Sequence, residues 1–291
     1  MSRILFQVLA LGLAVSGVLQ AQTFGLTPVS RALPSPLGSE GNGNSEQPAI
    51  SADGTRVVFR SCADNLIQGD SNGVCDLYLR QRDSSTTLRV SLASGGTQAN
   101  GQSAEPVLTL DGRYLVFSSS ASNLVASDPN GGSSDIFRRD LETGINTRVS
   151  VASDGSGGAS GQSSTPSVSA DGTRVAFYSC ATNLVAGDTS TQCGIFVRDL
   201  VAGVTLRASV ADDGSAANGA SVSGALSADG TKVAFVSCAS NLVPDDTNGF
   251  CDAFVRDLQA SRTVRANVAG DGSQANAEAT GLSISADGRY V

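Results

Sequence analysis

The sequence predicts an all-β protein, a β-propeller built of four-stranded antiparallel blades. A Ser/Thr-x-Asp-Gly marker recurs five times in the 291 residues, with its glycine at positions 54, 112, 172, 230 and 288. The repeat is therefore about 58 residues long, slightly more than a usual propeller blade. Each repeat holds short segments in which apolar and polar residues alternate, and none has the 3.6-residue period of a helix. Four short strands in each repeat are typical of a propeller blade.

The first repeat shows how its four strands, named A to D in chain order, are expected to follow one another. Strand A ends at the marker, and strand B is the alternating segment 55–61 (TRVVFRS) directly after it. Strands C and D are 76–83 (DLYLRQRD) and 87–93 (TLRVSLA). Asp-Gly between two alternating segments predicts a hairpin with a type I′ turn, because that turn needs positive φ. An array of β-sandwich repeats is the alternative, but it would need more strands and about 100 residues per repeat.

The markers also set the expected domain organisation. Residues 1–21 are expected to be a signal peptide, and residues 22–47 an N-terminal segment that acts as a linker or as a ring-closing strand. Four full blades and a partial fifth are expected at residues 48–105, 106–165, 166–223, 224–281 and 282–291. Such an incomplete ring leaves an unpaired sheet edge, which proteins normally avoid. We therefore expect a longer protein whose ring has five to seven blades.

Residues 1–21 have the three-part pattern of a secretory signal peptide. One positive charge at Arg3 is followed by an apolar run from Ile4 to Leu19 and by the small residue Ala21. A membrane anchor is the alternative, but the run is short of the roughly 20 apolar residues that a span needs, and no cationic segment follows it. We expect cleavage near Ala21, export to the periplasm or the extracellular space, and no membrane span in the mature chain.

Composition excludes several classes of function. The chain has no tryptophan and no histidine. Without histidine it cannot build a Ser-His-Asp triad, a Cys-His pair or a histidine-ligated metal site. It has 19 Lys and Arg residues and 27 Asp and Glu residues, and the net charge of −8 argues against nucleic acid as a partner. We expect no catalytic residue in this chain, although a hydrolase that uses two carboxylates stays open.

Cysteine spacing is the most specific pattern in the sequence. The six cysteines form three pairs with an identical separation along the chain: Cys62 and Cys75, Cys180 and Cys193, Cys238 and Cys251. The second repeat lacks both members, with Ser120 and either Ser133 or Ser134 in their places. Joint presence and joint absence indicate a bond, so in an exported chain the pattern predicts three disulfides, each closing a B–C loop. Free thiols or a metal site are the alternatives, but neither Cys-x-x-Cys nor histidine supports metal.

The same B–C loops carry the candidate metal ligands. Three loops contain Asp-x-Asn-Gly followed by a further Asp, and calcium prefers about six to eight oxygen ligands of these kinds. The candidates are Asp70, Asn72 and Asp76; Asp128, Asn130 and Asp135; and Asp246, Asn248 and Asp252. The third repeat keeps Asp188 but loses the amide, the glycine and the last carboxylate together. The sequence predicts structural calcium in at least one loop, with an ion-free Asp/Asn/Gly turn as the alternative.

Two segments of the repeat resemble a known family. Pro48–Phe59 (PAISADGTRVVF) and Pro166–Phe177 (PSVSADGTRVAF) are similar to the WD40-like repeat of TolB-like β-propellers. The resemblance covers residues 48–291 and implies a propeller in an exported, often periplasmic protein. Members of the family include a periplasmic protein associated with translocation and the propeller domains of some serine peptidases. The chain differs from the commoner pattern in having Ala52 and Ala170 where a second proline would stand, and in its longer B–C loops.

Other recurring residues are expected to be structural. Arginines recur in strand D, at Arg89, Arg148, Arg207 and Arg265, and Arg-Asp pairs such as Arg82-Asp83 and Arg139-Asp140 end strand C. We expect ion pairs that hold the blades together, each Arg meeting an Asp other than its sequence neighbour, because adjacent strand residues face opposite sides. The phenylalanines of strands B and C are expected to form the core between blades.

The loops lead to a functional hypothesis. In an antiparallel blade the long B–C and D–A loops lie on one face, and loops on a rigid scaffold commonly carry function. We expect an exported, non-enzymatic propeller that binds a protein or a cell-surface polymer through this long-loop face, with loops held by disulfides and calcium. The alternative is the propeller part of a secreted peptidase or glycosidase whose catalytic residues lie beyond Val291.

Overall fold

The computed structural model describes residues 40–155 and 157–291; the predicted signal peptide and residues 22–39 of the N-terminal segment lie outside them. The described residues form four four-stranded antiparallel sheets in chain order and no helix. Sheets 1 and 2 consist of β1 (Ser45–Ile50), β2 (Arg56–Ser61), β3 (Asp76–Gln81), β4 (Thr86–Arg89), β5 (Ser103–Leu108), β6 (Tyr114–Ser119), β7 (Asp135–Asp140) and β8 (Asn146–Arg148). Sheets 3 and 4 consist of β9 (Ser163–Val168), β10 (Arg174–Ser179), β11 (Gly194–Asp199), β12 (Val204–Arg207), β13 (Ser221–Leu226), β14 (Lys232–Ser237), β15 (Asp252–Asp257) and β16 (Arg262–Arg265).

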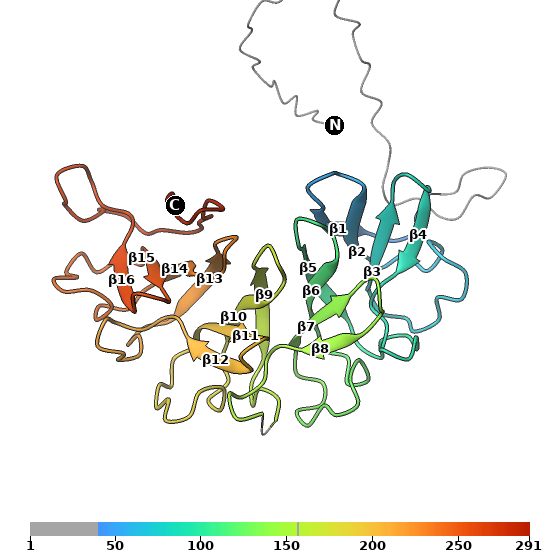
Figure 1. Cartoon of the computed structure of the whole chain (residues 1–291), viewed down its shortest axis with the longest axis horizontal. Coiled ribbons are helices and arrows are strands. Elements are labelled where there is room, and N and C mark those ends of the chain that lie inside the picture. The colour runs from blue at the N-terminus through green and yellow to red at the C-terminus, as the bar shows by residue number, and fades with distance from the viewer. Residues whose placement is uncertain (1–39, 156) are drawn as a thin grey trace, which may run out of the picture.

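The predicted propeller of four-stranded blades is confirmed, and its ring is open. The four sheets follow one another along an arc, with strand A of each sheet on the concave side and strand D on the convex side (Figure 1). The expected blade boundaries at residues 48, 106, 166 and 224 fall inside strand A of each sheet. After sheet 4 the chain repeats the marker turn, where Ala228 N donates to Ala286 O at 2.9 Å.

Each A–B hairpin turns at the Asp-Gly marker as predicted, but the predicted type I′ turn is wrong. The loop has four residues, because Ser51 N donates to Arg56 O across it at 3.0 Å. Gly54 has a φ of 69° while Asp53 stays outside the positive region, and a type I′ turn needs positive φ at both central residues. The Asp53 carboxylate instead caps the turn by accepting bonds from the Ser51 hydroxyl and from Thr55 N.

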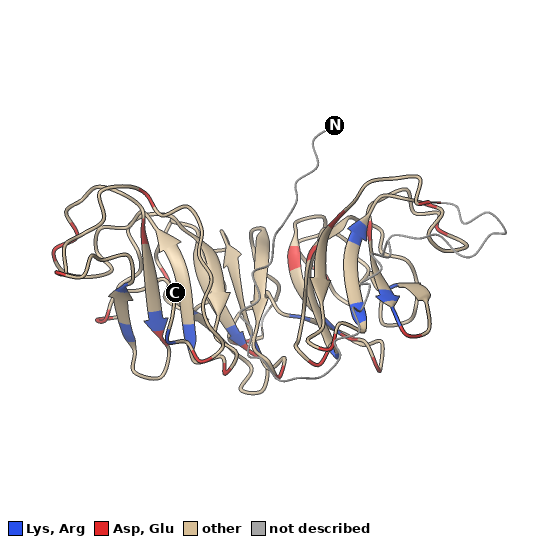
Figure 2. Cartoon of the chain, turned by 90° about the horizontal axis from the view of Figure 1, so that it is seen from above, with Lys and Arg blue, Asp and Glu red and all other residues tan. Residues whose placement is uncertain are grey.

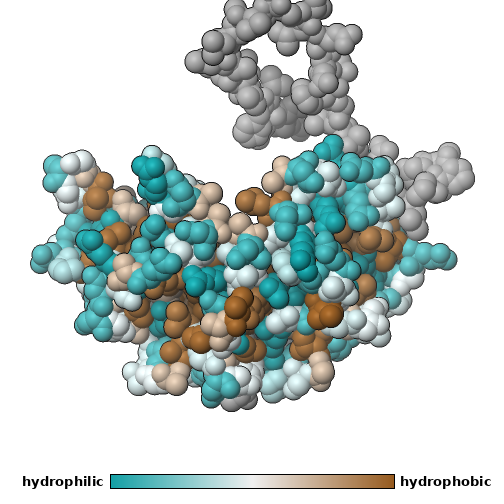
Figure 3. Space-filling model, in the orientation of Figure 1, coloured by the Kyte–Doolittle hydropathy of each residue, from teal (hydrophilic) through white to brown (hydrophobic). Residues whose placement is uncertain are grey.

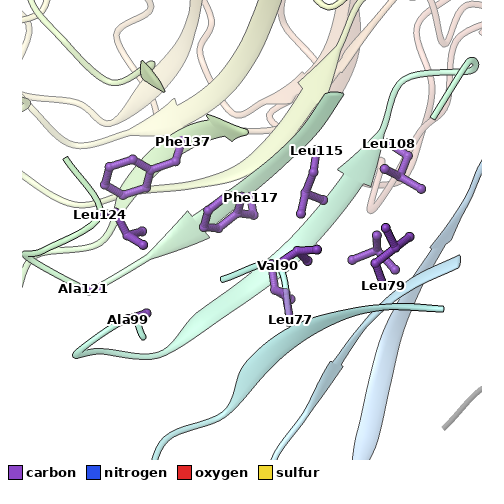
Figure 4. Close-up of a cluster of buried hydrophobic side chains, with 11 residues drawn as sticks. Leu77, Leu79, Val90, Ala99, Leu108, Leu115, Phe117, Ala121, Leu124 and Phe137 are labelled. Carbon is purple, nitrogen blue, oxygen red and sulfur yellow. The ribbon is translucent and has the colours of Figure 1, made fainter. Parts of the chain in front are cut away.

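The hydrophobic core lies between successive sheets, as the recurring phenylalanines predict. Side chains from one sheet interdigitate with those of the next, and the cluster between sheets 1 and 2 is shown in Figure 4. It includes Leu77, Leu79, Val90, Leu115, Phe117 and Phe137. Two further clusters join sheet 2 to sheet 3 and sheet 3 to sheet 4. Each sheet therefore buries one face against each neighbour, which is what makes the blades a single rigid scaffold.

Charged side chains are distributed unevenly over this scaffold. Lys and Arg lie mostly on the strands, whereas Asp and Glu lie mostly in the loops and turns (Figure 2). On the face shown in Figure 3, apolar residues form separate patches between polar ones. Among the described residues, no helix is long and apolar enough to cross a membrane.

Candidate binding face and its buried arginine centres

The three predicted disulfides are present, and each closes a B–C loop. Cys62 bonds to Cys75, Cys180 to Cys193, and Cys238 to Cys251. The B–C loops lie beside the D–A loops, as expected for one shared face: Gln98 Nε2 of a D–A loop donates to Gly69 O of a B–C loop at 2.7 Å. Disulfides fit an exported protein, because they persist in oxidising compartments.

An asparagine of each B–C loop fastens it to the preceding D–A segment. Asn123 Oδ1 accepts a bond from Asn100 N at 3.0 Å, and Asn123 Nδ2 donates to Gln98 O at 2.8 Å. The same two bonds recur in every sheet, formed by Asn65, Asn183 and Asn241. These amides therefore hold the B–C loops to the scaffold.

The predicted metal ligands of sheet 1 surround a guanidinium group. Arg89 of β4 places Nη2 2.7 Å from Asp70 Oδ1 and Nε 3.4 Å from Asp76 Oδ2. These three side chains are at most 5% exposed. Asn72 Nδ2 donates to Asp76 Oδ2 at 2.9 Å, and the hydroxyl groups of Ser91 and Tyr78 donate to Asp76 and Asp70. We call this group of buried side chains an arginine centre.

Sheets 2 and 4 contain the same centre. In sheet 4, Arg265 Nη2 lies 2.9 Å from Asp246 Oδ1, and its Nε lies 3.3 Å from Asp252 Oδ2. Asn248 Nδ2 donates to both carboxylate oxygens of Asp252, at 3.1 and 3.0 Å. In sheet 2, Arg148 bonds to Asp128 at 3.1 Å and also to Asp135 and to Asn130 Oδ1. All nine residues predicted as metal ligands therefore belong to arginine centres.

Sheet 3 has a smaller version of the centre. Arg207 Nη1 lies 2.9 Å from Asp188 Oδ2, and Arg207 Nη2 donates to Gln192 O at 2.8 Å. Gly194 stands where the other sheets have the second carboxylate, and a Cβ on Gly194 would lie 2.6 Å from Arg207 Nη2. The guanidinium has thus moved into the space that the missing aspartate leaves, where it lies over the ring of Phe196 at 5.2 Å.

Burial perturbs the acids of these centres. Removal from water raises the pKa of Asp76 and of Asp135 above the usual value for aspartate, although hydrogen bonds from Ser91 and Ser150 act in the opposite direction. Burial likewise raises the pKa of Tyr78, whose hydroxyl donates to Asp70. The guanidinium compensates only one of the two carboxylate charges. In sheet 1, Ser91, Asn72 and Tyr78 donate further hydrogen bonds to the two carboxylates.

In sheets 1 and 4 the asparagine is not oriented as a calcium ligand, whereas in sheet 2 Asn130 turns its oxygen toward the arginine. In sheets 1 and 4 the asparagine points its NH₂ group at the carboxylate, whereas a metal ligand would present its oxygen. In the part of the chain that the structure describes, no group of three or more carboxylates or cysteines is placed to hold a metal ion. The calcium hypothesis stays a prediction, and in all three loops a guanidinium group lies beside the predicted carboxylate ligands.

The recurring arginines are structural, but the expectation of ion pairs between blades is wrong for those of strand D. The strand-D arginines pair with acids of their own sheet. Arg139 and Arg198 of the Arg-Asp pairs donate instead to the carbonyl oxygens of Leu92 and Ala152, which belong to the preceding sheet's D–A segment.

Arg113 pairs with Asp140 and Arg174 with Asp199, each at 3.0 Å, so these acids do meet arginines other than their neighbours. The sequence placed Arg82-Asp83 at the end of strand C in sheet 1. The strand ends at Gln81, and Arg80 holds the register position that Arg139 holds in sheet 2.

The residues that differ between sheets lie on the concave side, and sequence reasoning missed them. At the loop end of strands A and B, every sheet has a Ser–Ser pair with Oγ atoms 2.9 to 3.0 Å apart. The next cross-strand pair differs in every sheet: it is Glu46 with Arg60, Ala104 with Ser118, Ser164 with Tyr178, and Val222 with Val236. A signal was present in the sequence, since these positions fail to repeat where their neighbours do.

The varying positions continue into a strained part of strand A. Each strand A contains a β-bulge and one non-glycine residue with positive φ: Gln47 (51°), Glu105 (54°), Thr165 (48°) and Ser223 (57°). These side chains also link the sheets, because Gln47 Oε1 accepts from Glu105 N at 2.9 Å, and Glu105 Oε2 accepts from Thr165 N at 2.7 Å. The positive φ recurs at the same position in all four strands, so it belongs to the geometry of the blade. We call the varying pairs and these four residues the inner edge.

The inner edge adjoins a hollow on the long-loop face. The hollow has a volume of about 360 Å³, and its walls include the Cys62–Cys75 disulfide, Asp64 and Gln102. Gln102 Oε1 also accepts a hydrogen bond from Arg60 Nη2 at 3.1 Å. A ligand in this hollow would therefore contact the disulfide-closed loop and Gln102, the hydrogen-bond partner of Arg60.

Comparison with known proteins gives structural similarity only. No protein-family profile and no curated protein sequence matches the chain. Similar solved structures include TolB from Acinetobacter baumannii, with 18% identity over 78% of this chain and 44% of that one and a TM-score of 0.46. They also include a structure from a study of two prolyl endopeptidases (14% identity, 79% and 30%, TM-score 0.48) and a putative TolB from Agrobacterium tumefaciens (16%, 78% and 82%, TM-score 0.35). The chain spans less than half the length of the first two, and such identities and TM-scores identify neither a family nor a function.

Proposed function

We propose that this chain is an exported β-propeller that binds a protein or a surface polymer through its long-loop face and does not catalyse a reaction. The observation that carries the proposal is the contrast at the inner edge. The side chains that build the scaffold repeat from sheet to sheet, whereas the strand-A members of the inner-edge pairs all differ and are exposed or half-buried: Glu46, Ala104, Ser164 and Val222. In a repeat protein, residues that serve the fold recur, and residues that serve a single ligand do not need to.

The charged groups of the long-loop face support binding over catalysis. The acids beneath the loops are paired with buried arginines, as in Asp70 with Arg89, so they are held as structural ions. The disulfides and asparagine bonds fix the loops before any partner arrives, which lowers the entropy lost on binding. Export is supported by the leader-like segment 1–21 and by the three disulfides.

The test is binding of the mature chain to an array of peptides and polysaccharides. A double variant, Glu46→Ala with Arg60→Ala, removes the pair of sheet 1 at the inner edge, and Val201→Ala is the control because Val201 is 81% exposed in the C–D turn on the opposite face. We expect the double variant to weaken binding at least about tenfold, or roughly 1.4 kcal/mol, and the control to bind as the wild type does. Equal binding by all three proteins, or turnover of a peptide or glycoside by the wild type, would contradict the proposal.

A further inference from the structure

The long loops already contain a cation, supplied by the neighbouring strand. In sheets 1, 2 and 4, the arginine of strand D lies between the two carboxylates that the loop motif provides, and each of these side chains is at most 6% exposed. Two carboxylates buried so deeply need a positive charge between them, because an uncompensated charge is very costly out of water. The arginine provides one positive charge without an ion from solution.

We propose that the guanidinium of the strand-D arginine is the cation of each long loop and lies where the acidic loop residues would otherwise bind calcium. Removal of this arginine from sheet 1, 2 or 4 would then create a divalent-cation site. Wild-type protein then needs no calcium to order its loops. Without Arg89, the oxygens of Asp70 and Asp76 would face a buried space with two negative charges and no counter-ion. Carboxylate pairs of this kind, completed by amide or main-chain oxygens and water, suit calcium.

Sheet 3 shows that the arginine and the first carboxylate form the essential pair. This sheet keeps Arg207 and Asp188, bonded at 2.9 Å, although it has lost the amide, the loop glycine and the second carboxylate. If the loop motif existed to hold calcium, its partial loss would leave no reason for a buried arginine to remain beside Asp188. If the arginine is the cation, one carboxylate is enough to neutralise it, and sheet 3 is the minimal form.

The asparagine contacts of sheets 1 and 4 support the same assignment, while in sheet 2 Asn130 Oδ1 accepts from Arg148 itself. Asn72 and Asn248 each direct the NH₂ group toward the second carboxylate, which adds positive potential where the guanidinium leaves one negative charge unbalanced. The amide oxygen of each residue instead accepts a main-chain N–H within the loop, from Val74 at 3.4 Å and from Phe250 at 3.1 Å. The amide therefore stabilises the second carboxylate, whose charge the guanidinium does not fully balance. Sheet 3 has neither the second carboxylate nor the amide.

The first experiment is a calcium titration of the mature wild-type protein by calorimetry, with melting curves recorded in chelator and in about 5 mM calcium, above the Kd of roughly 0.1 to 1 mM of extracellular calcium modules. We expect no heat of binding and the same Tm in both solutions, since a ligand that binds only the folded state would raise the Tm. Uptake of calcium by the wild type together with a calcium-dependent rise in Tm would overturn the proposal.

The second experiment compares Arg89→Ala with Arg207→Ala. We expect Arg89→Ala to take up one calcium ion per chain and to regain Tm in calcium, because it leaves two carboxylates. Arg207→Ala leaves only Asp188 and is expected to take up none. If Arg89→Ala is unfolded in chelator, recovery of its β-sheet circular dichroism on adding calcium supports the proposal. Failure of Arg89→Ala to bind calcium in either state, or equal uptake by the two variants, overturns it.

Discussion

Sheet 3 and the other three sheets contain the same buried arginine, but they hold it differently. Arg89, Arg148 and Arg265 each lie between two carboxylates, whereas Arg207 has Asp188 and a main-chain carbonyl. All four sheets nevertheless keep the same strand order, the same asparagine bonds and the same core. The comparison teaches that the fold requires the pair of one arginine and one carboxylate, and that the second carboxylate with its asparagine is an optional addition.

The largest expected effect follows from removing an arginine in each kind of centre. Arg89→Met leaves two buried carboxylates without a cation, and breaking a buried pair in this way costs about 3 to 5 kcal/mol. Arg207→Met leaves only one, so its cost is expected to be about 1 to 3 kcal/mol smaller. Urea unfolding of the two variants in chelator measures the difference. If Arg207→Met is the less stable variant, the second carboxylate does not carry a buried negative charge.

The disulfides give the next comparison, because their loops have the same sequence separation in sheets 1 and 3. Loop-closure entropy predicts a loss of about 3 kcal/mol for Cys62→Ala with Cys75→Ala, and the same loss for Cys180→Ala with Cys193→Ala. Without its disulfide, the sheet 1 loop is still held by an arginine centre with two carboxylates, whereas the sheet 3 loop is held by a centre with one carboxylate. We therefore expect limited proteolysis to cut the sheet 3 loop first. Earlier cutting of the sheet 1 loop would show that the larger centre adds no local stability.

The features that recur could be predicted from the sequence, because five copies of the marker allow the chain to be compared with itself. The disulfides, the hairpins and the Phe117–Phe137 type of core contact all follow from residues that repeat at the same spacing. The arginine centre could not be assigned in this way. Asp70 and Arg89 lie in different elements, and only the folded sheet brings the strand beneath the loop. An acidic loop considered alone resembles a metal site, because its counter-ion lies elsewhere in the sequence.

The third repeat nevertheless held a usable signal. The two residues that remain when the asparagine, glycine and aspartate are lost are Arg207 and Asp188, which are the two that bond. The inner edge needed the opposite reasoning, since its residues are identified by failing to repeat. Glu46 and Arg60 have no counterpart of the same chemistry in sheets 2, 3 and 4. The predicted type I′ turn was wrong because the Asp53 carboxylate accepts hydrogen bonds from the Ser51 hydroxyl and from Thr55 N. The Asp-Gly dipeptide alone does not reveal these bonds.

Restoring the missing acid of sheet 3 gives a smaller effect. In Gly194→Asp, the new Cβ would lie 2.6 Å from both Arg207 Nη2 and Ser209 Oγ, so the guanidinium must move back toward the position it has in the other sheets. Overpacking of this kind costs about 1 to 3 kcal/mol. We expect a loss of stability in that range by urea unfolding. Gly132→Asp in the B–C loop of sheet 2 is the control for added charge, since nothing lies within 4 Å of its Cβ position and its φ is not positive. Stability equal to the wild type would show that the Arg207 guanidinium moves away from the new aspartate without loss of folding free energy.

The smallest effect is a difference in pH dependence between sheet 1 and the marker turns. Burial raises the folded-state pKa of Asp76 above its usual value of 3.8, so the folded state binds the proton more tightly than the unfolded state does. Its stabilisation is complete below pH 3.8 and is lost as the pH rises through the raised pKa. The contribution of Asp53 to the pH dependence of stability has the opposite sign, because the hydrogen bond from the Ser51 hydroxyl lowers the pKa of Asp53 to about 2. Its stabilisation is present above pH 3.8 and is lost as the pH falls toward 2.

The two aspartates should therefore act in separate pH windows, and sheet 3 should take part only in the lower one. Urea unfolding between about pH 2 and pH 7 is expected to show that Asp76→Asn flattens the dependence above pH 3.8, whereas Asp53→Asn flattens it below. Asp171, in the marker turn of sheet 3, also has a lowered pKa and should behave like Asp53. Gly194 leaves sheet 3 without an equivalent of Asp76, so Asp171→Asn should leave the upper window unchanged. An unchanged upper window in Asp76→Asn would mean that the guanidinium offsets the whole cost of burying the second carboxylate.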